Sequence, residues 1–203
     1  MNSTLSLSIS GVHDCPQLDT VGVVISVAGR TAHTHSDIPD EVWNRMVENH
    51  TLFLRFDDVR DEEDIAEFHP PTPTHVEATL KLLDDVKPTS LHIHCYAGVS
   101  RSTALGLLAL KWANPTATDD DLVAELLRVR PYSLPNPLLV ELIDERLGCD
   151  FSSALSRVGL GWREPAFPGL ADWIESKAGL PLYGEYELDG AGTLVLRGED
   201  EDT

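Results

Sequence analysis

The amino-acid sequence predicts an α/β protein in which a central, largely parallel sheet of four to five strands is flanked by helices on both faces. Two observations carry this prediction. Apolar runs of strand length alternate with helix-length segments through the first half of the chain, and a cluster of helical segments follows. With 203 residues, 42% of them hydrophobic and 24% charged, the chain suits one domain with an ordinary core plus an appendage.

Four segments have the pattern of strands. Residues 5–9 alternate apolar and polar side chains, as on a half-buried strand, whereas residues 21–27 are continuously apolar and rich in β-branched side chains, as in a central strand. Residues 51–56 and 90–94 are two further apolar runs of strand length. We expect these four segments to form the sheet.

The predicted helices begin at capping residues. Thr72 and Pro73 give a cap followed by a proline in the first turn, and Thr118 precedes three aspartates that suit the positive end of a helix dipole. Pro137 opens another helix, which Gly148 ends. The expected helices therefore cover residues 38–47, a segment opening at 73, 103–112, 118–129 and 137–147.

The pattern changes after Gly148. A helix near residues 169–177 and two strand-like runs, 183–188 and 193–197, around a Gly-rich turn predict a small C-terminal helix and hairpin. We therefore divide the chain into a main domain over residues 1–150 and an extension over residues 151–203 packed on it. An acidic tail at 198–203 has the composition of a flexible, solvated segment.

Composition and charge exclude several classes of partner. The formal net charge of -19 opposes binding to nucleic acid or to an anionic membrane surface. No apolar run approaches the roughly 18 residues of a membrane span, and the first ten residues lack the basic region of a signal peptide. Three cysteines, Cys15, Cys95 and Cys149, form no even disulfide framework, which favours a reducing, cytoplasmic location.

Residues 94–102 carry most of the functional information. They read His94-Cys95-Tyr96-Ala97-Gly98-Val99-Ser100-Arg101-Ser102, between a predicted strand and a predicted helix. Such a loop turns backbone N–H groups and the positive end of a helix dipole toward one point, which makes a seat for a tetrahedral anion. The guanidinium of Arg101 adds a planar fork that suits two phosphate oxygens, and an electropositive loop favours the thiolate of Cys95. A thiolate beneath an anion seat is positioned to attack phosphorus.

This string resembles the signature loop of the cysteine-dependent protein tyrosine phosphatase superfamily. Residues 54–58 resemble the strand end that delivers the family's general acid, and residues 130–136 resemble the stretch after the loop in dual-specificity phosphatases. The resemblance covers about residues 5–147 and is closest to the small bacterial members. It implies a phosphotyrosine phosphatase II-like fold and hydrolysis of a phosphomonoester through a cysteinyl-phosphate.

The resemblance also assigns roles to single residues. Cys95 is the nucleophile, Arg101 binds the phosphate together with loop residues Tyr96, Ala97, Gly98, Val99 and Ser100, and Ser102 assists hydrolysis of the intermediate. Asp58 is the expected general acid, with Asp57, Asp61, Glu62, Glu63 and Asp64 as alternatives. His94 would orient the loop, and Gly98 would let the backbone approach the phosphate. Asn136 would either brace the loop or serve only as a helix cap.

Other interpretations remain open. The chain could be a catalytically silent module that binds phosphorylated partners, or a rhodanese-like sulfurtransferase, which also places a cysteine at a helix N-terminus. The pairs His92-x-His94 and His33-x-His35 have a spacing that metals use, but we predict neither a metal site nor a cofactor. Because the loop lacks lysine and a second arginine, we expect a singly phosphorylated substrate, either a phosphorylated protein or a small phosphomonoester, with phosphotyrosine first and phosphoserine or phosphothreonine also open.

Overall fold

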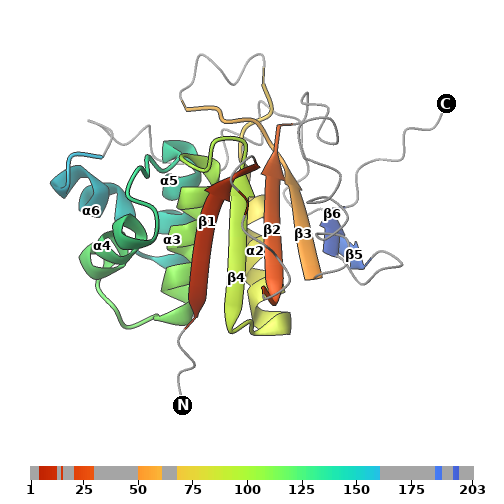
Figure 1. Cartoon of the computed structure of the whole chain (residues 1–203). Helices are drawn as coiled ribbons and strands as arrows, with labels where there is room; N and C mark the ends of the chain where they lie inside the picture. Colours follow the sequence, from red (N-terminus) through yellow and green to blue (C-terminus); the bar gives the residue numbers. More distant parts are fainter. Residues whose placement is uncertain are drawn as a thin grey trace.

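The computed structural model describes residues 5–12, 15, 21–29, 50–60, 68–160, 186–188 and 194–196. Within these ranges six strands form one sheet in the order β1-β4-β2-β3-β6-β5, seen from left to right in Figure 1. The strands are β1 (Ser6–Gly11), β2 (Val23–Ala28), β3 (His50–Arg55), β4 (Ser90–Cys95), β5 (Tyr186–Leu188) and β6 (Leu194–Leu196). The α/β class predicted from the sequence is confirmed.

The first four strands are parallel, and each lies where its apolar run predicted it. In the pairing register Gly11 lies opposite Cys95, and Ala28 lies opposite Arg55. The carboxyl ends of β1, β4, β2 and β3 therefore meet at one edge of the sheet. In open α/β sheets this edge is where ligands bind.

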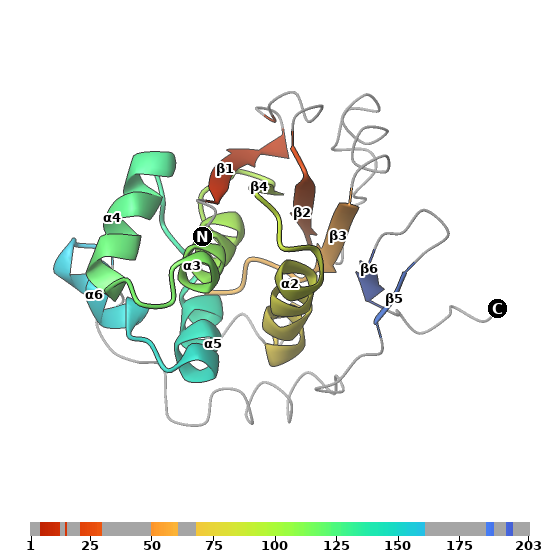
Figure 2. The ribbon, with the colours of Figure 1, turned by 90° about the horizontal axis from the view of Figure 1, so that it is seen from below.

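The described residues contain five helices, three of which begin at the predicted capping signals. They are α2 (Pro73–Val86), α3 (Arg101–Ala113), α4 (Asp119–Val129), α5 (Pro137–Leu147) and α6 (Phe151–Arg157). Seen along the strands in Figure 2, α2, α3 and α5 lie on one side of the sheet. The helix expected at residues 38–47 lies outside the described residues, so helices on the opposite face stay a prediction.

The hydrophobic core lies between the sheet and these helices. Ile25 of β2, Leu54 of β3 and Ile93 of β4 are completely buried, and they pack in one cluster with Leu83 of α2 and Leu107 of α3. Burying a side chain of this size contributes roughly 1.5–3 kcal/mol. This packing fixes β4 and α3, the two elements on either side of the loop at residues 96–100.

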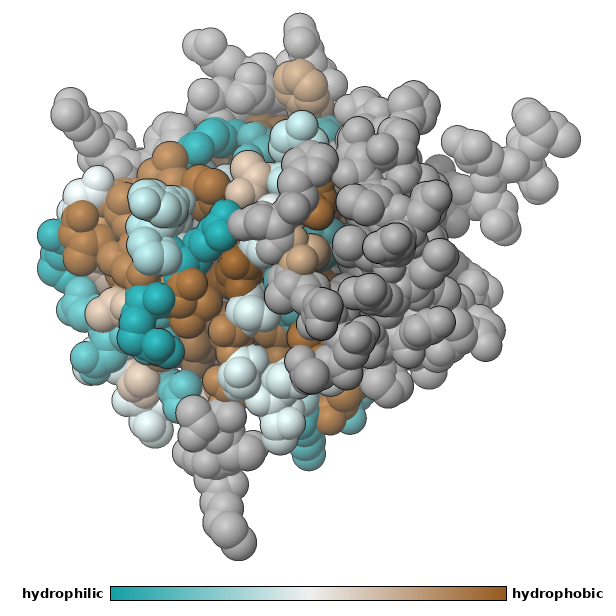
Figure 3. All heavy atoms as spheres, in the orientation of Figure 1, coloured by the Kyte–Doolittle hydropathy of each residue, from teal (hydrophilic) through white to brown (hydrophobic). Residues whose placement is uncertain are grey.

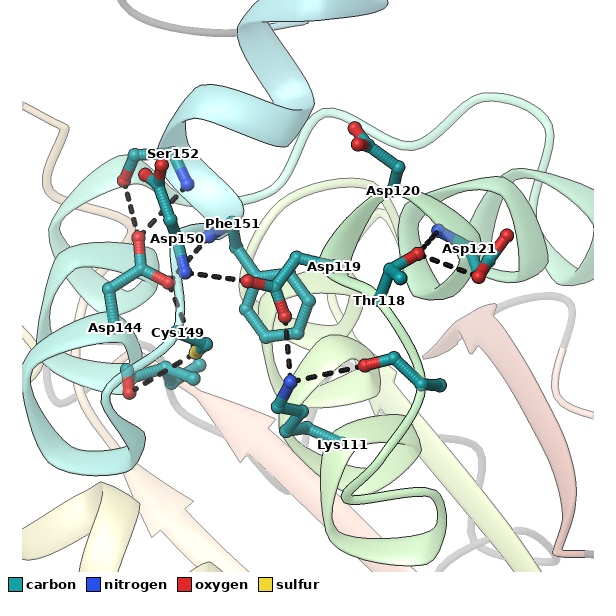
Figure 4. Close-up of polar contacts among 12 residues, drawn as sticks. Lys111, Thr118, Asp119, Asp120, Asp121, Asp144, Cys149, Asp150, Phe151 and Ser152 are labelled. Atoms are coloured by element: carbon teal, nitrogen blue, oxygen red, sulfur yellow. Dashed lines mark hydrogen bonds and ion pairs between the residues drawn. The ribbon is translucent and has the colours of Figure 1, made fainter.

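Helix α6 was not predicted from the sequence. Its start is held by Asp144 of α5, whose carboxylate accepts hydrogen bonds from the N–H groups of Phe151 (2.8 Å) and Ser152 (2.9 Å) and from the Ser152 hydroxyl (2.7 Å) (Figure 4). Burial raises the pKa of Asp144, although these hydrogen bonds oppose the shift. Phe151 is fully buried in the core cluster, so α6 packs as part of the helical layer.

The C-terminal hairpin joins the main sheet instead of standing apart from it. Strands β5 and β6 pair antiparallel, and β6 pairs in parallel with β3 through Phe53 and Val195. The sheet therefore has six described strands where four to five were expected. The helix expected at residues 169–177 and the tail at 198–203 lie outside the described residues, and the division at residue 150 stays a prediction.

Some apolar side chains reach the surface. In the view of Figure 3, hydrophobic residues are visible among polar ones over β1 and α4. The large exposed hydrophobic side chains of the described residues are Phe68, Val86, Tyr96, Tyr132, Leu134 and Val158. None of the described helices is long and apolar enough to cross a membrane.

Candidate active site

The site lies at the carboxyl edge of the sheet, where β4 ends at Cys95 and α3 begins at Arg101. The loop between them borders a cavity of about 740 Å³. The ends of β1 and β2 form one wall of this cavity, and the segment after β3 forms another. The described lining residues are Val12, Val27, Ala28, Gly29, Asp57, Asp58, Arg60, Cys95, Tyr96, Ala97, Val99, Ser100 and Arg101.

Every carbonyl of the loop from Tyr96 to Ser100 accepts a hydrogen bond from protein outside it. The donors are, in order, the N–H of Val12 (3.1 Å), Nη2 of Arg130 (3.3 Å), Nε of Arg130 (3.0 Å), the N–H of Leu134 (2.8 Å) and the N–H of Asn136 (3.2 Å). In a trans peptide the carbonyl and the following N–H point in opposite directions. The N–H groups of residues 97–101 therefore turn toward the inside of the loop.

These N–H groups add to the positive end of α3. The residue before the helix, Ser100, makes no side-chain cap to the first turn, so its hydroxyl does not compete for the helix N–H groups. Thr103 instead donates its hydroxyl to the carbonyls of Val99 (2.6 Å) and Ser100 (2.8 Å), which fixes the turn into the helix. The loop and the start of α3 thus have the geometry of an anion seat. Binding of an anion there stays a prediction.

Cys95 lies beneath this seat and is only 2% exposed. Its Sγ is 3.2 Å from Oγ of Ser102, in the first turn of α3. A hydroxyl at this distance can donate a hydrogen bond to a thiolate. The structure thus brings Cys95 and Ser102 together as the resemblance implied.

The guanidinium of Arg101 is buried next to the loop. Its Nη1 donates to the carbonyl of Phe56 (2.9 Å), just past the end of β3, which fixes the plane of the group. Its Nε is buried and has no hydrogen-bond partner among the described residues. Leaving a buried charged donor without a partner is costly, so this N–H is suited to an anion in the seat.

Two aspartates after β3 line the cavity, and their contacts separate their roles. Asp57 is buried, and its Oδ2 accepts the N–H of His69 (3.0 Å) while its own N–H donates to the His69 carbonyl (2.7 Å). Asp57 therefore joins the two sides of its own loop. Asp58 is exposed, and its Oδ1 accepts the hydroxyl of Ser100 (2.6 Å), a residue of the anion-binding loop. Asp58 is therefore tied to the anion-binding loop, and its role as general acid stays a prediction.

Asn136 both caps a helix and braces the site. Its Oδ1 accepts the N–H of Leu139 (3.0 Å) at the start of α5, and its Nδ2 donates to Oδ1 of Asp58 (2.8 Å) and to the carbonyl of Val59 (2.8 Å). The side chain is therefore a helix cap and a brace for the segment after β3, whereas the signature loop is contacted by the backbone N–H of Asn136, at the Ser100 carbonyl. Asp61, Glu62, Glu63 and Asp64, the alternative acids, lie outside the described residues.

Gly98 has a steric role that the sequence did not reveal. Its φ is +69°, and a Cβ placed on it would come within 3.0 Å of backbone atoms of Ser10 and Gly11. The glycine therefore lets the loop pack against the end of β1. The expectation that Gly98 also lets the loop backbone approach a bound phosphate stays a prediction.

The two histidines of β4 share one face of the sheet, with ring centroids 6.0 Å apart. Burial, followed by repulsion from His92, lowers the pKa of His94 to about 3, so this ring is neutral at physiological pH. The ring of His92 contacts Ser8 Oγ (2.8 Å) and Ser10 Oγ (3.2 Å) of β1. In the described part of the chain no group of three or more potential ligands could hold a metal; His33 and His35 lie outside it. A direct role of His94 in orienting the loop stays a prediction.

Arg130 is the functional residue that sequence reasoning missed. The sequence marks it only as the first residue of the stretch that resembles dual-specificity phosphatases, yet it holds two of the five loop carbonyls. No local signal in the sequence indicates this contact, because the arginine and its acceptors are more than thirty residues apart in the chain.

No family model and no curated protein matches the sequence. Solved structures do match the fold. Tk-PTP in its active form superposes with a TM-score of 0.50 at 15% identity, covering 72% of this chain and 94% of that one. A mouse putative dual specificity phosphatase complexed with zinc tungstate gives 0.49 at 19% identity, covering 78% and 89%. Human DUSP28 gives 0.47 at 17% identity, covering 77% and 97%. The superposition on Tk-PTP, together with the strand-loop-helix that carries Cys95 and Arg101, gives this chain the fold of the cysteine-dependent protein tyrosine phosphatases.

Proposed function

We propose that this protein hydrolyses phosphomonoesters through a cysteinyl-phosphate intermediate. One observation carries the proposal: the cavity that holds Cys95 beneath the anion seat also holds Asp58, so a nucleophile and a proton donor face one space. A binding module needs the seat alone. The carboxylate, hydrogen-bonded to Ser100 of the same loop, is the added feature that hydrolysis requires.

The reaction has two steps. In the first, the Cys95 thiolate attacks phosphorus, an S–P bond forms and the ester P–O bond breaks, while Asp58 gives its proton to the leaving oxygen. In the second, a water molecule attacks phosphorus while Asp58 takes a proton from it. The new O–P bond replaces the S–P bond, and inorganic phosphate leaves. Ser102 stabilises the departing thiolate, while Arg101 and the loop N–H groups hold the phosphoryl oxygens throughout.

We propose that the substrate is a phosphoprotein, with phosphotyrosine ahead of phosphoserine or phosphothreonine. Cys95 is almost fully buried, whereas Tyr96 beside it lies at the surface and is 59% exposed. Because the sulfur lies below the surface, the phosphate has to be carried to it on an extended group. The wall formed by Val12, Val27 and Ala28 is apolar, which suits an aryl ring. All three cysteines are free thiols, which supports action in the cytoplasm, and the net charge of -19 disfavours nucleic acid or membrane as a partner.

Hydrolysis of an aryl phosphate, with Cys95→Ser as the matched variant, tests the proposal. We expect turnover by the wild type that vanadate inhibits, and loss of turnover in Cys95→Ser without loss of oxyanion binding. Binding of the aryl phosphate without turnover by the wild type would favour a silent module. Transfer of sulfur from thiosulfate in place of phosphate hydrolysis would favour the sulfurtransferase.

A further inference from the structure

His75 lies away from the cavity lining but contacts several parts that support it. It occupies the third position of α2 and is 5% exposed. Its Nδ1 accepts the backbone N–H of Thr72 at 2.9 Å and lies 3.0 Å from the Thr72 hydroxyl. An Nδ1 that accepts a backbone N–H carries no proton, so the hydrogen of the neutral ring is on Nε2.

The second ring nitrogen reaches the other side of the same loop. His75 also makes a hydrogen bond to the backbone of Arg55, the last residue of β3. Because Nδ1 is occupied by the Thr72 N–H, the group of the neutral ring left to donate is Nε2–H, which makes the Arg55 carbonyl the acceptor. One side chain thus joins the end of β3 to the start of α2. Asp57 and Asp58 lie between these two points in the sequence.

The ring also packs against Phe56, with centroids 4.6 Å apart. Phe56 is completely buried, and its carbonyl accepts Nη1 of Arg101. A contact path therefore runs from His75 through Phe56 to the phosphate-binding arginine. Arg55 and Phe56 directly precede Asp57 and Asp58, so any shift of this backbone moves the acid as well.

We propose that His75 is a positioning residue for the reaction at Cys95, holding the backbone that carries both Asp58 and the carbonyl that orients Arg101. This inference rests on the phosphatase activity proposed above. A neutral imidazole, or an amide that imitates it, supplies an acceptor for Thr72 and a donor for Arg55 from two separate atoms of one side chain. An apolar residue of similar size fills the space but makes neither bond.

The experiment compares His75→Leu and His75→Gln with Thr79→Val as matched control. Thr79 lies one turn further along α2, is completely buried and donates to the His75 carbonyl (2.9 Å), so its loss destabilises the same helix without touching the loop. Melting temperature, vanadate affinity and kcat are measured, the last for two aryl phosphates, one with an activated and one with a poor leaving group.

We expect His75→Leu to lower kcat for the poor leaving group on the order of 10- to 100-fold, the loss typical of a catalytic group displaced by about 1 Å. The activated substrate should lose less, because it needs little proton donation. Vanadate affinity should fall as Arg101 loses its alignment, and His75→Gln should restore most of both. Thr79→Val should lower the melting temperature and leave the ratio of the two kcat values unchanged.

The positioning role is wrong if His75→Leu and Thr79→Val change both substrates by the same factor. If His75→Leu does not fold, His75→Asn replaces it, since its short amide can reach Thr72 but not Arg55. A kcat ratio in His75→Asn equal to that of the wild type would then contradict the role. A wild type that turns over neither substrate contradicts the proposed function instead.

Discussion

The amide of Asn136 donates from Nδ2 to Oδ1 of Asp58 at 2.8 Å, and the hydroxyl of Ser100 donates to the same oxygen at 2.6 Å. Two donors on Oδ1 leave Oδ2 as the oxygen able to carry a proton. The carboxyl group is thereby tied to the anion-binding loop through one oxygen, and Asp58 lines the cavity. This relationship links residues 78 positions apart in the chain.

Asp58→Asn should separate proton donation from phosphate binding. An amide keeps the size of the side chain but cannot give up a proton, so kcat for an aryl phosphate with a poor leaving group should fall by about 10²- to 10⁴-fold. An activated aryl phosphate should be slowed far less. Steady-state kinetics with both substrates test this, and equal losses on both would move the acid role to another carboxylate.

Asn136→Ser should uncouple the two roles of Asn136. Serine is a good N-cap, so α5 keeps its first hydrogen bond, whereas the short hydroxyl does not reach Asp58. We expect nearly wild-type stability with reduced kcat for the poor leaving group. Asn136→Ala should lose the same activity and also about 1 kcal/mol of unfolding free energy.

Thr118→Ala supplies the control for both Asn136 variants. Thr118 caps α4 through the N–H of Asp121 (3.2 Å), on a helix outside the cavity lining. Its loss should cost about 1 kcal/mol, read from urea unfolding, with no change in kinetics. If Asn136→Ser has wild-type kinetics, the bond to Asp58 does not position the acid.

Much of this architecture follows from local sequence. The strands are predictable because Ile25 and Ile93 stand in apolar runs, and α2, α4 and α5 because Thr72, Thr118 and Asn136 with Pro137 mark their starts. The loop is predictable because a thiol, a glycine and an arginine at this fixed spacing suit one task, which is to bind a phosphate group and attack it. These features act over a few residues, so a single sequence displays them.

The contacts that complete the site act across the chain. Arg130 reaches Gly98 over 32 positions, and Asp144 caps α6 from another helix, and neither pairing has a local pattern. The choice between Asp57 and Asp58 also depends on tertiary contacts, because both carboxylates are chemically suitable and adjacent. The two differ in burial and in their partners, because Asp57 is buried and accepts from His69, whereas Asp58 is exposed and accepts from Ser100.

Gly98→Ala should disrupt the site through backbone geometry. The positive φ of +69° disfavours any side chain, and the added Cβ would overlap the backbone of Ser10 and Gly11. Gly148→Ala is the matched control, since Gly148 has a φ of +63° and a Cβ added there would meet nothing within 4 Å. Gly148→Ala should cost roughly 1 kcal/mol and spare activity.

For Gly98→Ala we expect a larger loss of unfolding free energy together with weaker vanadate binding, because either the loop or the end of β1 must move. Thermal unfolding and a vanadate titration measure the two effects. Equal behaviour of the two alanine variants would show that only the backbone dihedral, and not the packing against β1, matters at Gly98.

Arg130→Met should weaken anion binding without removing a lining residue. Methionine keeps much of the side-chain volume but cannot hold the carbonyls of Ala97 and Gly98, so the N–H groups of the loop lose their orientation. We expect KM for an aryl phosphate and the inhibition constant of vanadate to rise about tenfold, the equivalent of one charged hydrogen bond. Arg128→Met, which removes an exposed partner of Glu125 near the end of α4, should change neither.

Acid should destabilise the fold through its buried imidazoles. Burial lowers the pKa of His75 from 6.5 to about 4, although a hydrogen bond to the backbone of Arg55 opposes the shift. Above pH 6.5 the ring is neutral in both the folded and the unfolded chain, so this stability is fully present. As pH falls from 6.5 to about 4, the unfolded chain takes up a proton that the folded chain does not, and stability is lost.

At about 1.4 kcal/mol for each pKa unit, His75 accounts for a loss of roughly 3 kcal/mol over this interval. His75→Gln removes the titrating group, so its unfolding free energy, measured in urea at several pH values, should fall less steeply than that of the wild type between pH 6.5 and 4. His94 continues the loss to about pH 3 in both proteins, because its pKa is lowered still further by burial and by His92. Parallel pH profiles for wild type and His75→Gln would mean that the folded protein takes up the proton on His75 as readily as the unfolded chain does.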